Sequence, residues 1–246
     1  MKRILQTLSA LALIFSAAGN AQAIPLTDLF NGQSITAGDK VFDQFKLIFQ
    51  GKSDGSTVNT NNINVTALND GGLNPGPGLM FNISNQEFNV MGDGIYAYLD
   101  FQFGFHVSVL DPNLRINGNS LEMANAFTTT SGQPINDDGS FILEKIGTAA
   151  GLSNLGSKNV EFSTLDDVIT NKLTDTAAFA SQSDIWVTKN ILVWATDVGD
   201  QAGFDSFSQR FSQVIRPSQI PEPATLTLMG LGLAGLSVVR RRKTMK

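Results

Sequence analysis

The sequence has 246 residues, of which 42% are hydrophobic and 16% are charged, and its formal net charge is −5. It contains one histidine and no cysteine, which excludes disulfides, thiolate zinc sites, iron–sulfur clusters and cysteine nucleophiles. Residues 24–220 hold 10 basic and 21 acidic residues, a net charge of −11. Because nucleic acid and anionic lipid repel such a body, we expect neither as a partner of it.

The N-terminus has the pattern of a secretory signal peptide. Lys2-Arg3 precedes an apolar stretch from Ile4 to Ala18, and Ala21-Gln22-Ala23 supplies small residues at a cleavage site. We therefore predict a signal helix over residues 1–23 with cleavage after Ala23; an uncleaved N-terminal anchor is the alternative. An exported domain without cysteine must be stabilised by burial of its core.

Short strands are predicted along the first third of the body. Phe45, Leu47 and Phe49 alternate with polar residues, and the same period of two recurs at residues 63–67 and 79–83. Gly38-Asp39 is predicted to form an ordinary turn. The intervening segments are rich in Gly, Asn, Ser and Pro, which is typical of loops.

The strongest pattern is the alternation over residues 95–109, which predicts one long strand with one dry face and one wet face. The dry face comprises Ile95, Ala97, Leu99, Phe101, Phe103, Phe105, Val107 and Val109; the wet face comprises Tyr96, Tyr98, Asp100, Gln102, Gly104, His106 and Ser108. Such faces favour an antiparallel sheet. Because the strand is long, we expect a bend or bulge, with Gly104 as its position.

The second half of the body continues in the same manner. Asn117-Gly118 is predicted to be a two-residue hairpin turn, and residues 141–143, 160–162 and 185–195 are predicted strands. Residues 164–181 have the best helical content, although their periodicity is weak. Residues 204–215 fit either a helix or a terminal strand, and we favour the strand.

These elements predict a mainly β protein. We expect an antiparallel β-sandwich of jelly-roll-like type over residues 24–216, preceded by the signal helix and followed by a single membrane-spanning helix.

Few residues in the body suggest chemistry, and we expect no catalytic activity and no cofactor. His106 is predicted to lie on the wet face of its strand as a surface or hydrogen-bonded residue, since one histidine cannot form a His-rich zinc site. The acids Asp137-Asp138, Asp166-Asp167, Asp197 and Asp200 could supply oxygen ligands to Ca²⁺, although they do not match an EF-hand loop. Trp186 and Trp194 are expected in the core; stacking on sugar rings is the alternative.

The C-terminal 26 residues combine a rigid motif, an apolar run and a basic cluster. Pro221-Glu222-Pro223 lies in a linker over residues 217–223, and the two prolines favour extended backbone. Ala224 to Val239 carries no charge and would span about 24 Å as a helix, short of the hydrocarbon core of a bilayer. The cluster Arg240, Arg241, Arg242 and Lys243 follows, and it predicts a cytoplasmic C-terminus for a membrane segment within residues 224–246.

This order of features resembles the C-terminal sorting segment of bacterial PEP-CTERM proteins. The resemblance implies that Pro221-Glu222-Pro223 is recognised by exosortase, an integral-membrane processing enzyme, and that the protein is then released or transferred to the cell surface. The family is associated with exopolysaccharide-producing bacteria. The pattern from Gly38-Asp39 through Phe42 to Phe45 is also similar to exported domains of such proteins.

We therefore expect an exported surface or extracellular-matrix protein, held briefly in the inner membrane and associated with exopolysaccharide without acting as an enzyme. The alternative is a secreted carbohydrate-binding or polysaccharide-acting module carried on the same tail.

Overall fold

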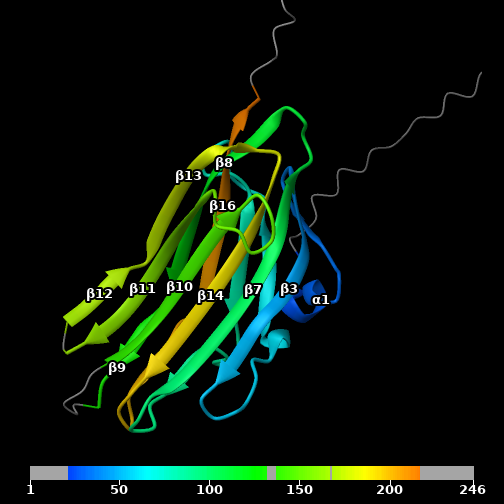
Figure 1. The fold of residues 1–246 in the computed structure, drawn as a ribbon. Helices are drawn as coiled ribbons and strands as arrows, with labels where there is room; N and C mark the ends of the chain where they lie inside the picture. Colours follow the sequence, from blue (N-terminus) through cyan, green and yellow to red (C-terminus); the bar gives the residue numbers. More distant parts are fainter. Residues whose placement is uncertain (1–21, 132–136, 167, 217–246) are drawn as a thin grey trace, which may run out of the picture.

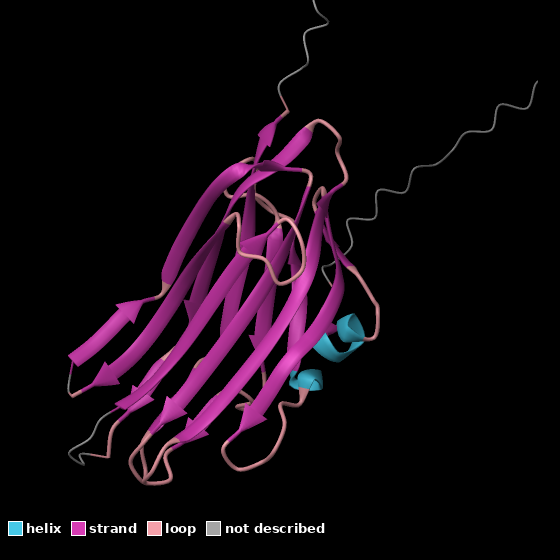
Figure 2. Ribbon diagram, viewed as in Figure 1, coloured by secondary structure: helices cyan, strands magenta, loops and turns pink. Residues whose placement is uncertain are grey.

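The structure is a computed structural model in which residues 22–131, 137–166 and 168–216 are described (Figure 1). Two large antiparallel sheets stack face to face, and Figure 2 shows almost no helix beside them. The prediction of a mainly β antiparallel sandwich is confirmed. Residues 1–21 of the predicted signal peptide, the linker and the membrane segment lie outside the described residues, whereas Ala23 is described and exposed. Within the described residues, no helix is long and apolar enough to span a membrane.

The six-stranded sheet contains, in spatial order, β1 (Ile24–Pro25), β4 (Ile63–Leu68), β5 (Gly78–Ile83), β16 (Ser206–Ile215), β8 (Leu114–Ala124) and β13 (Thr174–Gln182). The seven-stranded sheet contains β12 (Val168–Lys172), β11 (Gly156–Leu165), β10 (Asp137–Gly147), β14 (Asp184–Ala195), β7 (Ala97–Val109), β3 (Lys40–Lys52) and β2 (Ile35–Ala37). A third sheet of β6 (Asn89–Met91), β15 (Gln201–Gly203) and β9 (Phe127–Thr129) is small. The α-helix α1 (Leu26–Phe30) and the 3₁₀ turn η1 (Thr60–Asn62) lie beside β3 in Figure 1.

Phenylalanine side chains fill the space between the two large sheets. The predicted dry face of β7 is buried from Ala97 to Val107, whereas Ile95 lies before the strand and is 85% exposed. From the opposite sheet, Phe81 of β5 stacks on Phe207 of β16 with ring centroids 4.4 Å apart. The alternation of β7 thus places its aromatic face against a matching aromatic face.

Several local predictions are confirmed. The strands expected around residues 45–49, 63–67, 79–83, 141–143, 160–162 and 185–195 are all present, and residues 206–215 form the terminal strand β16. The Gly38-Asp39 turn connects β2 to β3, with Gly38 at φ +57°.

Three other predictions are wrong. Within residues 164–181, residues 168–172 form β12 and residues 174–181 belong to β13 instead of a helix, because pairing with β11 and β8 satisfies their backbone groups and outweighs a weak helical propensity. Asn117-Gly118 is not a hairpin turn: it lies inside β8, where the register with β16 shifts beside it. Gly104 of β7 pairs without a shift to β14, and the bulges occur in the neighbouring strand β3, near Gln44 and Ile48.

The core also contains charged side chains. Glu144 of β10, Lys158 of β11 and Lys189 of β14 point between the sheets, and at most 1% of each side chain is exposed. Glu144 contacts both lysines, so each buried charge has an oppositely charged partner, as burial of charge requires.

Candidate functional site

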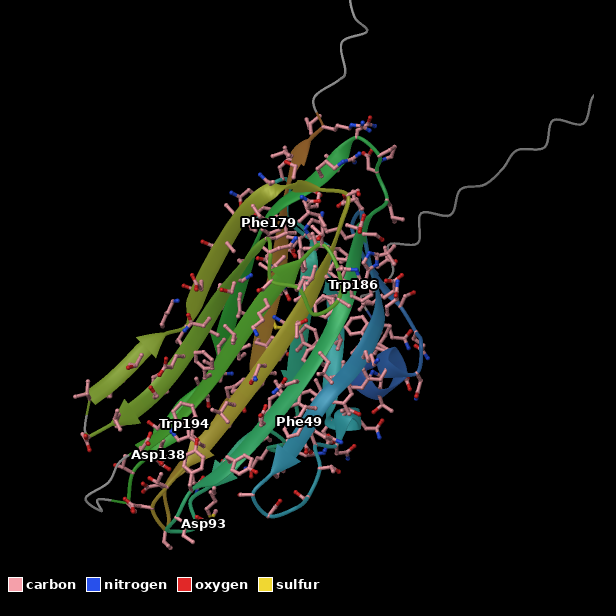
Figure 3. All side chains as sticks on the ribbon, viewed as in Figure 1. Phe49, Asp93, Asp138, Phe179, Trp186 and Trp194 are labelled. Carbon is pink, nitrogen blue, oxygen red and sulfur yellow. The ribbon has the colours of Figure 1, made fainter. Side chains whose placement is uncertain are left out.

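The outward-facing surface of the seven-stranded sheet carries aromatic and hydrogen-bonding side chains, and we call it the outer face. On β14 the outward positions are Trp186, Thr188, Asn190, Leu192 and Trp194, and on β7 they are Tyr98, Asp100, Gln102, Gly104 and His106. Figure 3 shows Trp186 and Trp194 at two ends of this face. Both indoles are only partly buried, so the expectation that they lie in the core is wrong.

Cross-strand pairing places these residues in rows. Trp194 lies opposite Tyr98, and Trp186 lies opposite His106, whose ring centroid is 5.0 Å from that of the indole. Between them, Asn190 lies opposite Gln102. At about 3.3 Å per residue, the two tryptophans are roughly 26 Å apart along β14. The outer face is therefore an extended strip with an aromatic group at each end and amides between.

A groove of about 690 Å³ opens beside Trp186. Its lining includes Trp186 and Thr188 of β14, Gly104 of β7, the bulged segment of β3 from Gln44 to Ile48, and Ala150 with Gly151 from the loop after β10. Because Gly104 has no side chain, the floor of the groove is open between Trp186 and the bulged strand. The size is typical of a small-molecule or oligomer subsite.

His106 occupies the wet face of β7, as predicted. Its Nδ1 lies 2.9 Å from Asp43 Oδ1, and its Nε2 lies 3.6 Å from Asp184 Oδ1. These two carboxylates fix the imidazole ring beside Trp186, which itself lines the groove.

Tyrosines extend the aromatic strip beyond Trp194. Tyr96 and Tyr98 stack with centroids 6.0 Å apart, and Tyr96 is 41% exposed. Burial of part of the ring, together with the charge of Asp137, raises the pKa of the Tyr96 phenol. The phenol is therefore a neutral hydrogen-bonding group at ordinary pH.

Acidic side chains gather at the Trp194 end of the sheet. Asp137 Oδ1 accepts a hydrogen bond of 2.8 Å from Trp194 Nε1, which holds the indole in place. Asp138 Oδ1 accepts from the Thr196 amide at 3.1 Å, and Asp200 Oδ1 accepts from the Ser131 amide. Asp138 and Asp200 are fully buried, and the second oxygen of each has no donor.

Burial raises the pKa of Asp138 to about 6, with a further contribution from the Asp200 carboxyl and against the lowering effect of the Thr196 amide. A proton on Asp138 supplies the donor that the two free oxygens lack, so the pair is best satisfied when it shares one proton.

Two of the other predicted acids lie elsewhere in the sequence of elements. Asp166 lies in the turn between β11 and β12, and Asp167 lies outside the described residues. In the described ranges, no set of three or more His, Asp or Glu side chains is arranged to hold a metal ion.

The sequence contained signals for two features that were not predicted, the outward-facing tryptophans of β14 and the inward-facing Lys189. In β14 the tryptophans alternate with Ile185, Val187, Ile191 and Val193, a parity that assigns the indoles to the side opposite the core. The same parity places Lys189 inward, among apolar residues.

Residues 219–243, at the C-terminus, match the PEP-CTERM protein-sorting motif. This range includes Pro221-Glu222-Pro223 and the basic cluster, which lie outside the described residues. No curated protein matches the chain.

The solved structures that are similar to part of the chain include three distant matches. TmCBM61, solved in complex with beta-1,4-galactotriose, is 13% identical with a TM-score of 0.23, over 70% of this chain and 89% of its own. A glycosylation-associated Gap123 complex from Streptococcus agalactiae is 8% identical with a TM-score of 0.24, over 55% and 20%. A family 16 carbohydrate-binding module is 18% identical with a TM-score of 0.18, over 61% and 84%. Similarities this distant give no ground for transferring a ligand.

The sorting motif carries a direct consequence for the whole chain. Such a tail implies export, transit through the membrane and delivery to the surface, with exosortase as the general type of processing partner. The resemblance of the C-terminus is thus confirmed: the chain carries a PEP-CTERM protein-sorting motif, and its described body is an antiparallel β-sandwich.

Proposed function

We propose that this protein is an exported, non-enzymatic surface component whose outer face binds a polysaccharide chain of the extracellular matrix. The observation that carries the proposal is the strip from Trp186 to Trp194, which offers aromatic groups at both ends with amides between. Sugar rings present apolar C–H faces and peripheral hydroxyls, and aromatic side chains beside hydrogen-bonding groups suit both.

The strip fits an extended ligand better than a compact one. The groove beside Trp186 is open on the sheet surface, and Thr188, Asn190 and Gln102 continue from it toward Trp194. Neutral amides and hydroxyls can bond to sugar hydroxyls in either direction, as donors or acceptors. The body also carries 21 acidic against 10 basic residues, which favours a neutral glycan over an acidic one.

Binding without hydrolysis is favoured by the placement of the acids. Glycosidases use two carboxyl groups that reach the scissile bond. Asp138 and Asp200 are both fully buried, so this pair does not reach a sugar bound on the outer face, and the carboxylates of Asp43 and Asp184 lie against the two ring nitrogens of His106. Release of reducing ends from neutral β-linked glucans, galactans or the exopolysaccharide of the exporting cells would instead indicate a polysaccharide-acting enzyme.

The binding test is affinity electrophoresis of the full chain through gels containing neutral β-linked glucans, galactans or the exopolysaccharide of the exporting cells. At least one polysaccharide should retard the wild type. Trp186→Ala and Trp194→Ala should each weaken that binding at least tenfold, about 1.4 kcal/mol.

The matched control is Ile169→Ala on the edge strand β12, where the side chain is 64% exposed and away from the strip. It should bind as the wild type does. Retardation that is unchanged in both tryptophan variants would refute the outer face as the binding surface.

Processing of the tail is tested separately. We expect protein recovered from the cell surface to lack the predicted membrane segment, residues 224–246, and we expect Pro221→Ala and Pro223→Ala to remain in the inner membrane. Surface protein that keeps residues 224–246 would show that the tail is a permanent anchor.

A further inference from the structure

A row of charged side chains crosses the core between the two sheets. In the seven-stranded sheet, Glu144 lies directly opposite Lys158 on one side and Lys189 on the other. Glu144 Oε1 contacts Lys158 Nζ, and Glu144 Oε2 contacts Lys189 Nζ. Lys189 Nζ also lies 5.3 Å from the ring centroid of Phe207, in the six-stranded sheet.

One amide from the six-stranded sheet completes this row. Asn119 of β8 is 2% exposed; its Oδ1 accepts a hydrogen bond from Lys158 Nζ, and its Nδ2 donates to Glu144 Oε1 at 2.6 Å. The orientation of the amide follows from these partners, since Lys158 can only donate. The Lys158 nitrogen therefore lies against the Asn119 carbonyl group inside the buried core.

The β8 bulge explains why Asn119 reaches this position. Gly118 pairs with Ser212 of β16, and Ile116 pairs with Gln213, so Asn117 is the extra residue. The extra residue changes the parity of the strand. As a result, Ile116 and Asn119 are both buried although three positions separate them.

The charges of the row do not balance. Two lysines face one carboxylate, and burial lowers the pKa of Lys158 and lowers that of Lys189 to about 8, although Glu144 opposes both shifts. Burial alone would raise the pKa of Glu144, but the two lysines hold it below its ordinary value. The core thus contains an anionic carboxylate and an ammonium group that readily gives up a proton.

We propose that Lys158 and Asn119 condense into an intramolecular isopeptide bond that joins the two sheets, with Glu144 transferring the protons. Glu144 takes a proton from the Lys158 ammonium, and the free amine attacks Asn119 Cγ while the carbonyl electron pair moves to Oδ1. The pair returns as the Cγ–Nδ2 bond breaks, and Nδ2 leaves as ammonia after receiving the proton from Glu144.

The balance of the reaction is closed. After the attack, the lysine nitrogen carries one proton more than the amide product, and Glu144 takes this proton and passes it to the departing ammonia. An alkylammonium and a carboxamide thus give a secondary amide and one ammonium ion, and no oxidant or reductant takes part. The departing ammonium removes the surplus positive charge. Glu144 and Lys189 then remain as a single balanced pair in the core.

Glu144 is placed for this role because one oxygen, Oε1, contacts both the attacking nitrogen and the departing nitrogen. A base that becomes an acid must lie within hydrogen-bond reach of both atoms. The buried row supplies that geometry without any exposed group.

A second buried lysine provides an internal comparison. Lys40 of β3 contacts Gln213 Oε1 of β16 across the same two sheets, and Asp39 Oδ1 lies 3.0 Å from its Nζ. However, the Gln213 amide nitrogen donates to Gly72 O at 3.3 Å, whereas the Asp39 carboxylate accepts from Lys40 Nζ. Asp39 therefore does not link the lysine nitrogen to the amide nitrogen as Glu144 does. We expect no bond between Lys40 and Gln213.

The test is a peptide map of the full chain, purified in its folded, exported form and digested with trypsin after denaturation. The expected product joins residues 116–145 to residues 146–172 through Asn119 and Lys158, with no cleavage after Lys158. It must carry two free N-termini, at Ile116 and Ile146, which separates it from an uncleaved linear peptide of nearly equal mass.

Fragment ions must also place the loss of ammonia at Asn119, because cyclisation at Asn117-Gly118 loses the same mass. The isopeptide bond lowers the positive charge of the chain by one, whereas the cyclic imide leaves the charge unchanged. A lower isoelectric point than that of the same chain without the bond, found together with the joined peptide, is therefore specific to the proposed isopeptide bond.

The joined peptide should be present in the wild type and in the matched control Lys40→Met, and it should be absent from Glu144→Gln and Lys158→Met. Since the wild-type map is decisive by itself, misfolding of a variant does not weaken the test. Release of residues 146–158 with a free Lys158 amine from folded wild-type protein would overturn the proposal. Full bond formation in Glu144→Gln would overturn the role of Glu144.

Discussion

The buried Asp138–Asp200 pair makes the stability of the sandwich depend on pH. Asp138 has a pKa of about 6 in the folded protein, against an ordinary value of 3.8. Between these two values the folded protein keeps a proton that the unfolded chain releases, so stability falls as pH rises. The stabilisation is fully present below pH 3.8 and is lost above about pH 6.

The size of the effect follows from the shift. A difference of about two pKa units corresponds to about 3 kcal/mol of unfolding free energy. Asp138→Asn imitates the protonated carboxyl, because an amide keeps the acceptor for Thr196 and adds a donor that can satisfy Asp200 Oδ2. The variant should therefore match the wild type near pH 4 and exceed its stability by up to about 3 kcal/mol at pH 7.

The assay is urea unfolding of wild type and variant at pH 4, 5, 6 and 7, with the difference in unfolding free energy as the readout. Asp205→Asn, at an exposed position, is the control for loss of a carboxylate and should have an unfolding free energy close to that of the wild type. A flat difference for Asp138→Asn, or one that decreases with pH, would refute the assignment of a buried, proton-holding pair.

Two further predictions concern the core. Phe81→Ala removes a fully buried ring that stacks on Phe207 and should lower the unfolding free energy by about 3–5 kcal/mol in urea titrations, whereas Ile48→Ala, at a side chain 52% exposed, should have a much smaller effect. Lys189→Met tests the charge balance of the row, because the isopeptide bond leaves Lys189 as the sole cation beside Glu144. In urea titrations the variant should lose about 3–5 kcal/mol of unfolding free energy. A nearly unchanged unfolding free energy would mean that Lys158 still serves as a cation.

The sequence by itself determined the class of the body and the destination of the chain. Strict alternation over β7 cannot be satisfied by a helix, because only a strand sends successive side chains to opposite faces. The C-terminal order of Pro221-Glu222-Pro223, apolar run and basic cluster is local in the chain, and the match to residues 219–243 confirms it without reference to the fold.

Local propensity was insufficient where neighbouring strands decide the conformation. Residues 168–182 contain good helix formers, but the edges of β11 and β8 were available to pair with them. Asn117-Gly118 is a common hairpin turn in isolation, yet long-range pairing with β16 keeps it inside a strand as a bulge. The pairing of β13 with β8 and of β16 with β8 joins residues about 50 to 100 positions apart, which no short window contains, whereas β12 pairs with β11 close by in the sequence.

Only the tertiary structure brought the functional groups together. Strand parity could assign Trp186 to the surface, but the groove beside it also needs the β3 bulge and the loop after β10. Likewise, an inward parity could flag Lys189 and Glu144, whereas the contact of Lys158 with Asn119 arises from packing one sheet on the other. Alternation fixes the face of each residue, while the partner across the core is fixed by register, bulges and sheet stacking.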